Sequence, residues 1–286
     1  MFAPVDTRVP QQVEEQVRCI YRTLFPDAAP GFVQRAFSWA SQCFTGHFAD
    51  YQSIDARYHD FEHTLQGTLC LARLLHGYHK AGATPQLTRH AFELALLAIL
   101  FHDTGYLKRR GDTEGTGAKY TLVHVARSAD FAREFLLQQG YATEEIDAIR
   151  HMIRCTGVNA DLDVIPFRNQ IERNLGYALA TADLLGQMAA PDYIDKLPVL
   201  FQEFAEAVRH DGPNAGRIAA FRSAEALMQN TPSFWENYVV PKITHDFGNI
   251  VLYLSDPYPD GPNDYLRRIE QNLALIPQKL AALRAP

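Results

Sequence analysis

A histidine and an aspartate stand next to each other at the end of a stretch that is apolar on every face. Residues 94–101 read Leu-Ala-Leu-Leu-Ala-Ile-Leu-Phe, and His102 and Asp103 follow directly. A helix that is apolar all round must be buried, and an imidazole and a carboxylate at its end destabilise the fold unless their charges are compensated. A bound divalent cation would compensate them. A pair of helix caps, hydrogen-bonded to the backbone, is the structural alternative.

Asp183 has an equally apolar setting, because residues 177–185 read Tyr-Ala-Leu-Ala-Thr-Ala-Asp-Leu-Leu. An unpaired carboxylate there would destabilise the folded state, so it must contact either a metal cation or a basic side chain. Arg173 or Lys196 could supply that side chain. Metal binding and ion pairing are therefore both open for Asp183.

His59 and His63 are four residues apart in a helix that we expect to begin near Asp60. At 100° per residue, the two imidazoles lie on neighbouring faces about 40° apart. On the same helical wheel His63 falls close to Cys70 and Leu74, and thus toward the core. This favours His63 as a buried metal ligand and leaves His59 free to face a substrate.

Two further histidines fall on or near apolar arcs of expected helices. His124 shares an arc with Phe131 and Phe135, and His151 lies at the edge of the arc that contains Ile149. We expect both as metal ligands, with a hydrogen-bonded core histidine as the alternative. The other histidines show no comparable pattern and are expected on the solvated surface: His47, His76, His79, His90, His210 and His245.

The order of a histidine, an adjacent His-Asp pair and a distant aspartate resembles the signature of the HD superfamily of metal-dependent phosphohydrolases. Residues 58–64, Tyr-His-Asp-Phe-Glu-His-Thr, are also similar to the Tyr-His-Asn-x-x-His-Ala motif of class I cyclic nucleotide phosphodiesterases. The resemblance covers roughly residues 58–188. It implies an HD-type helical bundle, His59 as the general acid, and a first metal ion held by four residues: His63, His102, Asp103 and Asp183.

His124 and His151 extend the resemblance to HD proteins with two metal ions, in which they would hold the second ion and Asp103 would bridge the pair. The expected cofactor is a divalent transition metal, one or two ions of Mn, Fe, Co, Zn or Ni, with Mg allowed at a second site. Metal-bound hydroxide would attack phosphorus, while His59 protonates the leaving oxygen. Asp103 is thus expected to take part in catalysis as well as in metal binding.

The expected substrate is a small-molecule phosphoester, either a phosphodiester or a nucleotide-like compound. Candidates to bind its phosphate oxygens are Lys108, Arg109, Arg110 and Arg154, for which a solvated surface charge is the alternative. Residues 104–108 read Thr-Gly-Tyr-Leu-Lys and lack the His-Pro that phosphodiesterases carry after Asp103, which disfavours a cyclic nucleotide.

Two other functions compete with hydrolysis. The same six ligands resemble those of the di-iron oxygenases of the superfamily, such as the inositol oxygenases and the phosphonate-cleaving oxygenases. A metal-stabilised helical scaffold without turnover, with the C-terminal helices as a partner surface, is the third hypothesis.

The composition limits the partners. The 286 residues carry a net charge of -6, which disfavours duplex nucleic acid and anionic membranes, since both require clustered cations. The four cysteines have no CxxC spacing, and no apolar run reaches the roughly 18 residues that span a bilayer. We therefore expect a cytoplasmic protein that does not bind membranes. If it forms an oligomer, we expect a homodimer.

Apolar residues recur at helical spacing along the whole chain, so the fold should be all-α. We expect N-terminal helices in residues 1–57, the metal-binding core in 58–190 and a C-terminal helical extension in 191–286. The helices themselves are expected at 10–25, 30–45, 60–80, 87–103, 121–139, 143–156, 170–189, 192–210, 215–229, 233–254 and 263–283. The loops 46–58 and 104–120 should form the rim of the site.

Overall fold

The fold is all-α, as the periodicity predicts. The computed structural model describes residues 4–48 and 50–284, and in that part of the chain no strand forms. Two isolated bridges, Tyr51 with Arg109 and Ser255 with Asn263, are the extended pairings found there. The first of them joins the two expected rim loops.

Ten α-helices and seven short helical turns follow one another along the described residues. The α-helices are α1 (Pro10–Leu24), α2 (Phe32–Thr45), α3 (Phe61–Lys80), α4 (Arg89–Phe101), α5 (His124–Gln138), α6 (Thr143–Arg154), α7 (Gln170–Met188), α8 (Tyr193–Asp211), α9 (Ala224–Phe234) and α10 (Asp264–Arg284). The turns are η1 (Thr104–Tyr106), η2 (Gly117–Tyr120), η3 (Leu162–Val164), η4 (Gly212–Ala220), η5 (Trp235–Val239), η6 (Lys242–Asp246) and η7 (Ile250–Leu254).

The predicted helices up to residue 210, and the last one, agree with these bounds to within three residues. Two predictions between them are wrong. The helix expected at 215–229 begins only at Ala224, after the N-cap Ser223, because Gly216 has a φ of 53° that breaks the helical path. The helix expected at 233–254 is divided into π and 3-10 turns. Pro241, which has no amide hydrogen to donate, lies between the first two of them.

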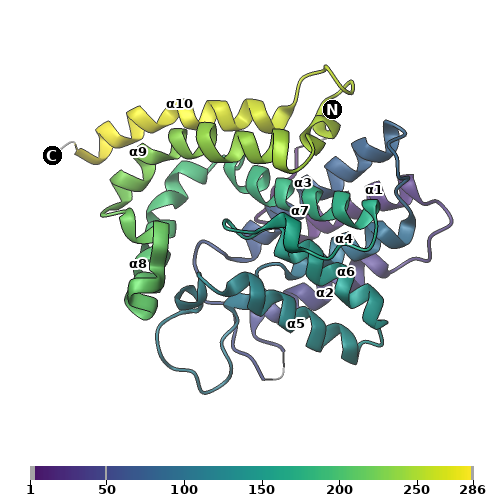
Figure 1. The fold of residues 1–286 in the computed structure, drawn as a ribbon, viewed down its shortest axis with the longest axis horizontal. Coiled ribbons are helices and arrows are strands. Elements are labelled where there is room, and N and C mark those ends of the chain that lie inside the picture. The colour runs from purple at the N-terminus through teal and green to yellow at the C-terminus, as the bar shows by residue number, and fades with distance from the viewer. Residues whose placement is uncertain (1–3, 49, 285–286) are drawn as a thin grey trace.

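The helices α1 to α7 form a bundle, and α8, α9 and α10 extend from one side of it (Figure 1). Within the bundle α3 and α7 pack closely. A Cβ on Gly186 of α7 would lie 2.7 Å from the carbonyl oxygen of Gln66 on α3, so only glycine allows this approach. The close contact holds the start of α3 beside the second half of α7.

The helix α4 lies inside the bundle, as its apolar sequence requires. Every residue from Leu94 to Phe101 is buried, and His102 is its C-cap. Its chain therefore delivers His102 and Asp103 into the interior, where they are 1% and 2% exposed. Among the described residues no helix has both the length and the apolar character needed to cross a bilayer.

Candidate metal centre

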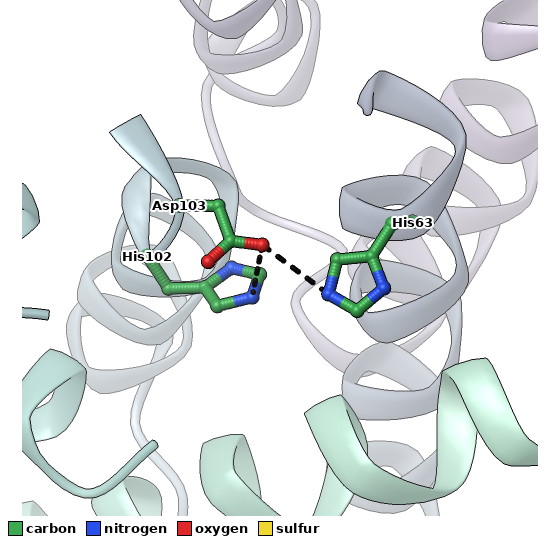
Figure 2. A group of neighbouring side chains, drawn as sticks. All are labelled: His63, His102 and Asp103. Carbon is green, nitrogen blue, oxygen red and sulfur yellow. Dashed lines mark ion pairs between the residues drawn. The ribbon is translucent and has the colours of Figure 1, made fainter. Parts of the chain in front are cut away.

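The group His63, His102 and Asp103 comes from two helix ends that meet inside the bundle. Asp60 is the N-cap of α3, and its carboxylate accepts a hydrogen bond of 2.8 Å from the amide of His63. This cap fixes the first turn of α3 and with it the direction of the His63 ring. The side chains of all three residues point toward one another (Figure 2).

The potential ligand atoms of this group lie within 4.8 Å of one another. The distance from Oδ2 of Asp103 is 3.2 Å to Nε2 of His63 and 3.2 Å to Nε2 of His102. All three residues are buried. The group could therefore hold a metal ion, as the sequence predicts.

Asp183 on α7 faces the same two imidazoles. Its Oδ1 lies 3.3 Å from Nε2 of His63 and 3.4 Å from Nε2 of His102. The basic partners considered for this carboxylate are engaged elsewhere, since Lys196 pairs with a carboxylate of α3 at 2.7 Å and Arg173 lies over an aromatic ring. The structure thus brings together all four residues expected around a first ion.

Three atoms of this cluster are buried without a hydrogen-bond partner: Nε2 of His102, Oδ2 of Asp103 and Oδ1 of Asp183. Buried polar atoms are almost always satisfied, so such a concentration at one point needs an explanation. The other ring nitrogen of His102 lies 2.7 Å from the carbonyl oxygen of Ile99. A hydrogen on that nitrogen leaves a lone pair on Nε2, as metal ligation by histidine requires. The donor set therefore fits a divalent cation.

In the metal-free cluster the imidazoles and carboxylates act as charge partners. Burial alone lowers the pKa of His63, but the interactions with Asp103 and Asp183 outweigh it and raise that pKa from 6.5 to about 9. Burial also lowers the pKa of His102, but the same two carboxylates outweigh it and hold that pKa well above its ordinary value. Burial raises the pKa of the Asp103 carboxyl, but the neighbouring imidazoles bring it well below its usual range.

These shifts predict that metal binding releases protons. With these raised pKa values both imidazoles should be in the positively charged imidazolium form at pH 7 in the metal-free protein. Each must lose its second proton to coordinate, so about two protons should leave per ion. The apparent metal affinity should then rise with pH, and the contribution of His63 to that rise should end near pH 9. Calorimetric titrations at pH 7 in buffers of different ionisation enthalpy measure the number released. A value near zero would show that the imidazoles are already neutral.

The same shift determines how the stability of the metal-free fold changes with pH. A pKa raised from 6.5 to about 9 stabilises the folded state fully below pH 6.5, and this contribution is lost as the pH rises through 9. The metal-free protein should therefore unfold more readily at pH 9 than at pH 6.5.

His59 lies beside the cluster and is held by a residue far away in the sequence. Its Nδ1 is 2.6 Å from Oε2 of Glu203 on α8, and Oε1 of the same carboxylate accepts the amide of Tyr58 at 2.6 Å. Burial raises the pKa of Glu203, but His59 and the backbone amides outweigh it, so the pKa is lowered and the carboxylate stays charged. This leaves Nε2 of His59 as the nitrogen that can meet a substrate.

His124 also lies at the edge of the cluster. Its Nε2 is 3.8 Å from Oδ1 of Asp103, the oxygen that does not face His63 and His102, and its Nδ1 is 2.6 Å from the carbonyl oxygen of Thr121. Burial lowers its pKa, so Nε2 has a free lone pair at neutral pH. The inward orientation predicted for His124 is present, and a ligand role for it is still a prediction.

His151 is not brought to the cluster. Its Nδ1 lies 2.5 Å from Oε1 of Glu172, a residue at the start of α7. From Glu172 to Asp183 the helix rises about 16 Å, at 1.5 Å per residue. Two ions that share Asp103 would be only about 4 Å apart, so this position does not support His151 as a ligand of the second ion.

Some of the cations expected to bind phosphate already have partners within the fold, and a phosphate-binding role for the set stays a prediction. Lys108 is buried, donates to the carbonyl oxygen of Gly115 at 2.6 Å and pairs with Asp55 at 2.9 Å. Arg110 donates to a backbone carbonyl of the other rim loop. Arg109 lies 5.2 Å from the ring centre of a tyrosine, and Arg154 is exposed at the end of α6.

Glu203 is the residue of this site that the sequence did not reveal. A signal was available, since Glu203 follows Leu200 by three residues and precedes Ala207 by four, and so falls on the apolar stripe of α8. Its burial calls for a partner, as it does for Asp183. The spacing could not name that partner, because His59 lies 144 residues earlier.

The fold and the cluster together define an all-α protein with a candidate metal centre between α3, α4 and α7. Residues 110–255 match the Npun_R2479-like family. This stretch is just over half of the chain, so the chain belongs to that family. It contains Asp183 and Glu203, whereas His63, His102 and Asp103 precede it. No curated protein matches the chain.

Proposed function

We propose that this protein is a metal-dependent phosphohydrolase of the HD type that acts on a small phosphoester. The observation that carries the proposal is a cluster of three buried nitrogen and oxygen atoms that have no hydrogen-bond partner and could ligate a metal. Beside it lies a histidine whose other ring nitrogen contacts a carboxylate. The cluster supplies a place for a Lewis acid and the histidine supplies a proton donor. Together they are the two components that phosphoester hydrolysis requires.

The ion would be held by His63, His102, Asp103 and Asp183. Two imidazoles with two carboxylates suit Mn, Fe, Co, Zn or Ni better than Mg alone, because imidazole is a softer ligand than oxygen. When bound, such an ion supplies a Lewis acid that polarises a phosphoryl oxygen and lowers the pKa of a water molecule. Burial of His63, His102 and Asp103, with Asp183 only 14% exposed, keeps most bulk water away from that point.

His59 would protonate the leaving oxygen. Its Nδ1 lies 2.6 Å from the Glu203 carboxylate, which holds the ring in one orientation and leaves Nε2 free to meet a substrate. The His59 ring is 14% exposed, so it lies at the edge of the buried cluster, where a substrate can reach it. A proton held on Nε2 is then available to the departing alcohol.

The charges around the cluster favour a substrate with few negative charges. Lys108 and Lys119 are buried against Asp55 and Asp112, and Lys196 pairs with Glu62, the residue before His63. Their charges are therefore already neutralised. A phosphodiester or a similar singly charged ester fits these surroundings better than a substrate that carries several phosphates.

The position of His151 bears on the oxygenase alternative. That reaction class requires a set of six ligands, and the structure collects four of them with His124 at the edge. With His151 held by Glu172, a second ion would lack one of its expected ligands. Hydrolysis at the four-residue cluster needs no contribution from it.

The test combines metal analysis with two assays on the same preparation. The protein is purified anaerobically, its bound metals are measured, and it is assayed against a panel of phosphodiesters and phosphomonoesters and for oxygen uptake. We expect about one transition-metal ion per chain, release of alcohol or phosphate from one class of ester, and no oxygen uptake. Oxygen consumption without hydrolysis would overturn the proposal in favour of the oxygenase. Bound metal without either activity would favour the scaffold.

A further inference from the structure

The helix α8 presents two carboxylates three residues apart, and each holds one of the loops beside the cluster. Glu203 accepts hydrogen bonds from the 46–60 loop through Tyr58 and His59. Glu206 accepts from Thr116 in the 104–120 loop, from its amide at 2.5 Å and from its hydroxyl at 2.8 Å. All four carboxylate oxygens of this helix face are thus used to position loops.

The segment 115–117 is held residue by residue. The carbonyl oxygen of Gly115 accepts from Lys108, Thr116 is held by Glu206, and the amide of Gly117 donates to Oδ1 of Asp55 at 2.6 Å. Three charged side chains from three parts of the chain therefore fix three consecutive residues. This segment is therefore held in one conformation by more contacts with charged side chains than a surface turn requires.

This segment packs directly against Tyr106, the last residue of η1. A Cβ on Gly117 would lie 2.1 Å from the carbonyl oxygen of Tyr106, so the two backbones are in close contact. Tyr106 itself is fully buried. Any movement of the segment must therefore be transmitted to Tyr106.

The ring of Tyr106 is the surface against which two histidines of the site lie. It stacks on His59 with ring centres 4.5 Å apart and planes 16° apart, and on His124 at 4.8 Å and 22°. The orientation of His59 thus depends on two supports, the Glu203 carboxylate at Nδ1 and the Tyr106 ring at its face.

We propose that Glu206 is a positioning residue of this site: by holding Thr116 it fixes the 115–117 segment, and through it the Tyr106 ring that sets the orientation of His59 and His124. Glu206 is not one of the four cluster residues, and its two hydrogen bonds go to Thr116. The inference rests on the proposed acid role of His59, because only that role makes the orientation of the ring matter for turnover.

The test uses the full chain with added Zn²⁺ and histidine labelled with ¹³C in the ring, so that each imidazole gives its own NMR signal. Glu206→Ala should move the signals of His59 and His124, because their stacking on Tyr106 changes, and leave that of the exposed His245 in place. Zinc content should stay the same. In the assay kcat should fall about 10- to 100-fold with little change in KM, since misplacement of a catalytic group acts on the chemical step.

Two variants separate positioning from a general loss of structure. Glu206→Gln keeps an acceptor for the Thr116 amide and a partner for its hydroxyl, so it should restore both the histidine signals and kcat. Gln202→Ala, an exposed position on the same helix, should change neither. If Glu206→Ala fails to fold, Thr116→Val takes its place; it keeps the amide bond to Glu206 but replaces by a methyl group the hydroxyl that donates to Glu206 and accepts from the Ala118 amide.

Unchanged signals of His59 and His124 in a folded Glu206→Ala protein would overturn the inference. A change in KM alone, with kcat intact, would also count against it. The NMR readout needs no turnover, so it distinguishes the two proposals. If the signals move but no ester is hydrolysed, the coupling through Tyr106 holds and the proposed function fails.

Discussion

Replacing Asp103 by asparagine should abolish both metal binding and activity. Asp103 is the carboxylate that faces both His63 and His102, at 3.2 Å from each Nε2. Asparagine has almost the same shape but a neutral amide, so the loss isolates the charge. Residues that only support a ligand contribute 10–100-fold to metal affinity, and removal of a ligand should exceed about 100-fold.

The stability of the metal-free variant is part of the same prediction. With Asp103 neutral, only Asp183 is left to balance the two imidazoles, so the pKa of His63 should fall back from about 9. Loss of one partner from a buried charge pair typically destabilises a protein by about 3–5 kcal/mol. Chemical denaturation of metal-free protein at pH 7 measures this change, and the difference from the parent should shrink at pH 9.

The control is Asp27→Asn, an exposed aspartate outside the site, which should leave metal content, activity and stability unchanged. Metal analysis after dialysis and the ester assay are run on both variants. An Asp103→Asn protein that keeps stoichiometric metal would exclude Asp103 as a ligand. The buried pairs would then be a structural ion-pair network.

Much of the site can be predicted because burial of a charge leaves a signal in the sequence. His102, Asp103 and Asp183 stand in stretches with few other polar residues, so the amino-acid sequence alone indicates that each needs a partner. His63 follows from its phase on a helix whose N-cap, Asp60, is itself readable. Most helix boundaries follow from the same apolar periodicity.

The residues that sequence cannot place depend on loops and on distant partners. Lys108 is expected from sequence to meet a phosphate, but the path of its loop turns it toward Asp55 and Gly115. His151 has the right burial but pairs with Glu172, which is a matter of how α6 and α7 are aligned. Helical phase gives the face of a residue but not its height against a neighbouring helix.

Replacing His59 by glutamine should lower kcat without loss of metal. General acids contribute about 10²–10⁴-fold, so a fall in this range is expected when the proton donor is removed. Metal content should be unchanged, because Nδ1 of His59 is bound to Glu203 and its ring is no part of the four-residue cluster. Glutamine can still donate to Glu203, so the anchoring of α8 to the 46–60 loop is preserved.

The leaving group provides the decisive comparison. A phosphoester with a p-nitrophenyl leaving group departs as a stable anion and needs no proton, whereas an alkyl ester needs one. The loss in His59→Gln should therefore be large for the alkyl ester and small for the p-nitrophenyl ester. Measurement of kcat for both, in parent and variant, shows whether the losses differ. His47→Gln, which changes an exposed histidine that contacts the hydroxyl of Thr45, serves as the control.

Glu203→Gln should behave as a weaker form of the same change. Glutamine at this position replaces the carboxylate oxygen that holds Nδ1 of His59 by a neutral amide, so the ring is held less firmly and kcat for the alkyl ester should fall, but less than in His59→Gln. Because the two residues act as one unit, the double variant should be little worse than His59→Gln alone. Equal losses for both esters in His59→Gln, or fully additive effects in the double variant, would mean that His59 orders the site without donating a proton.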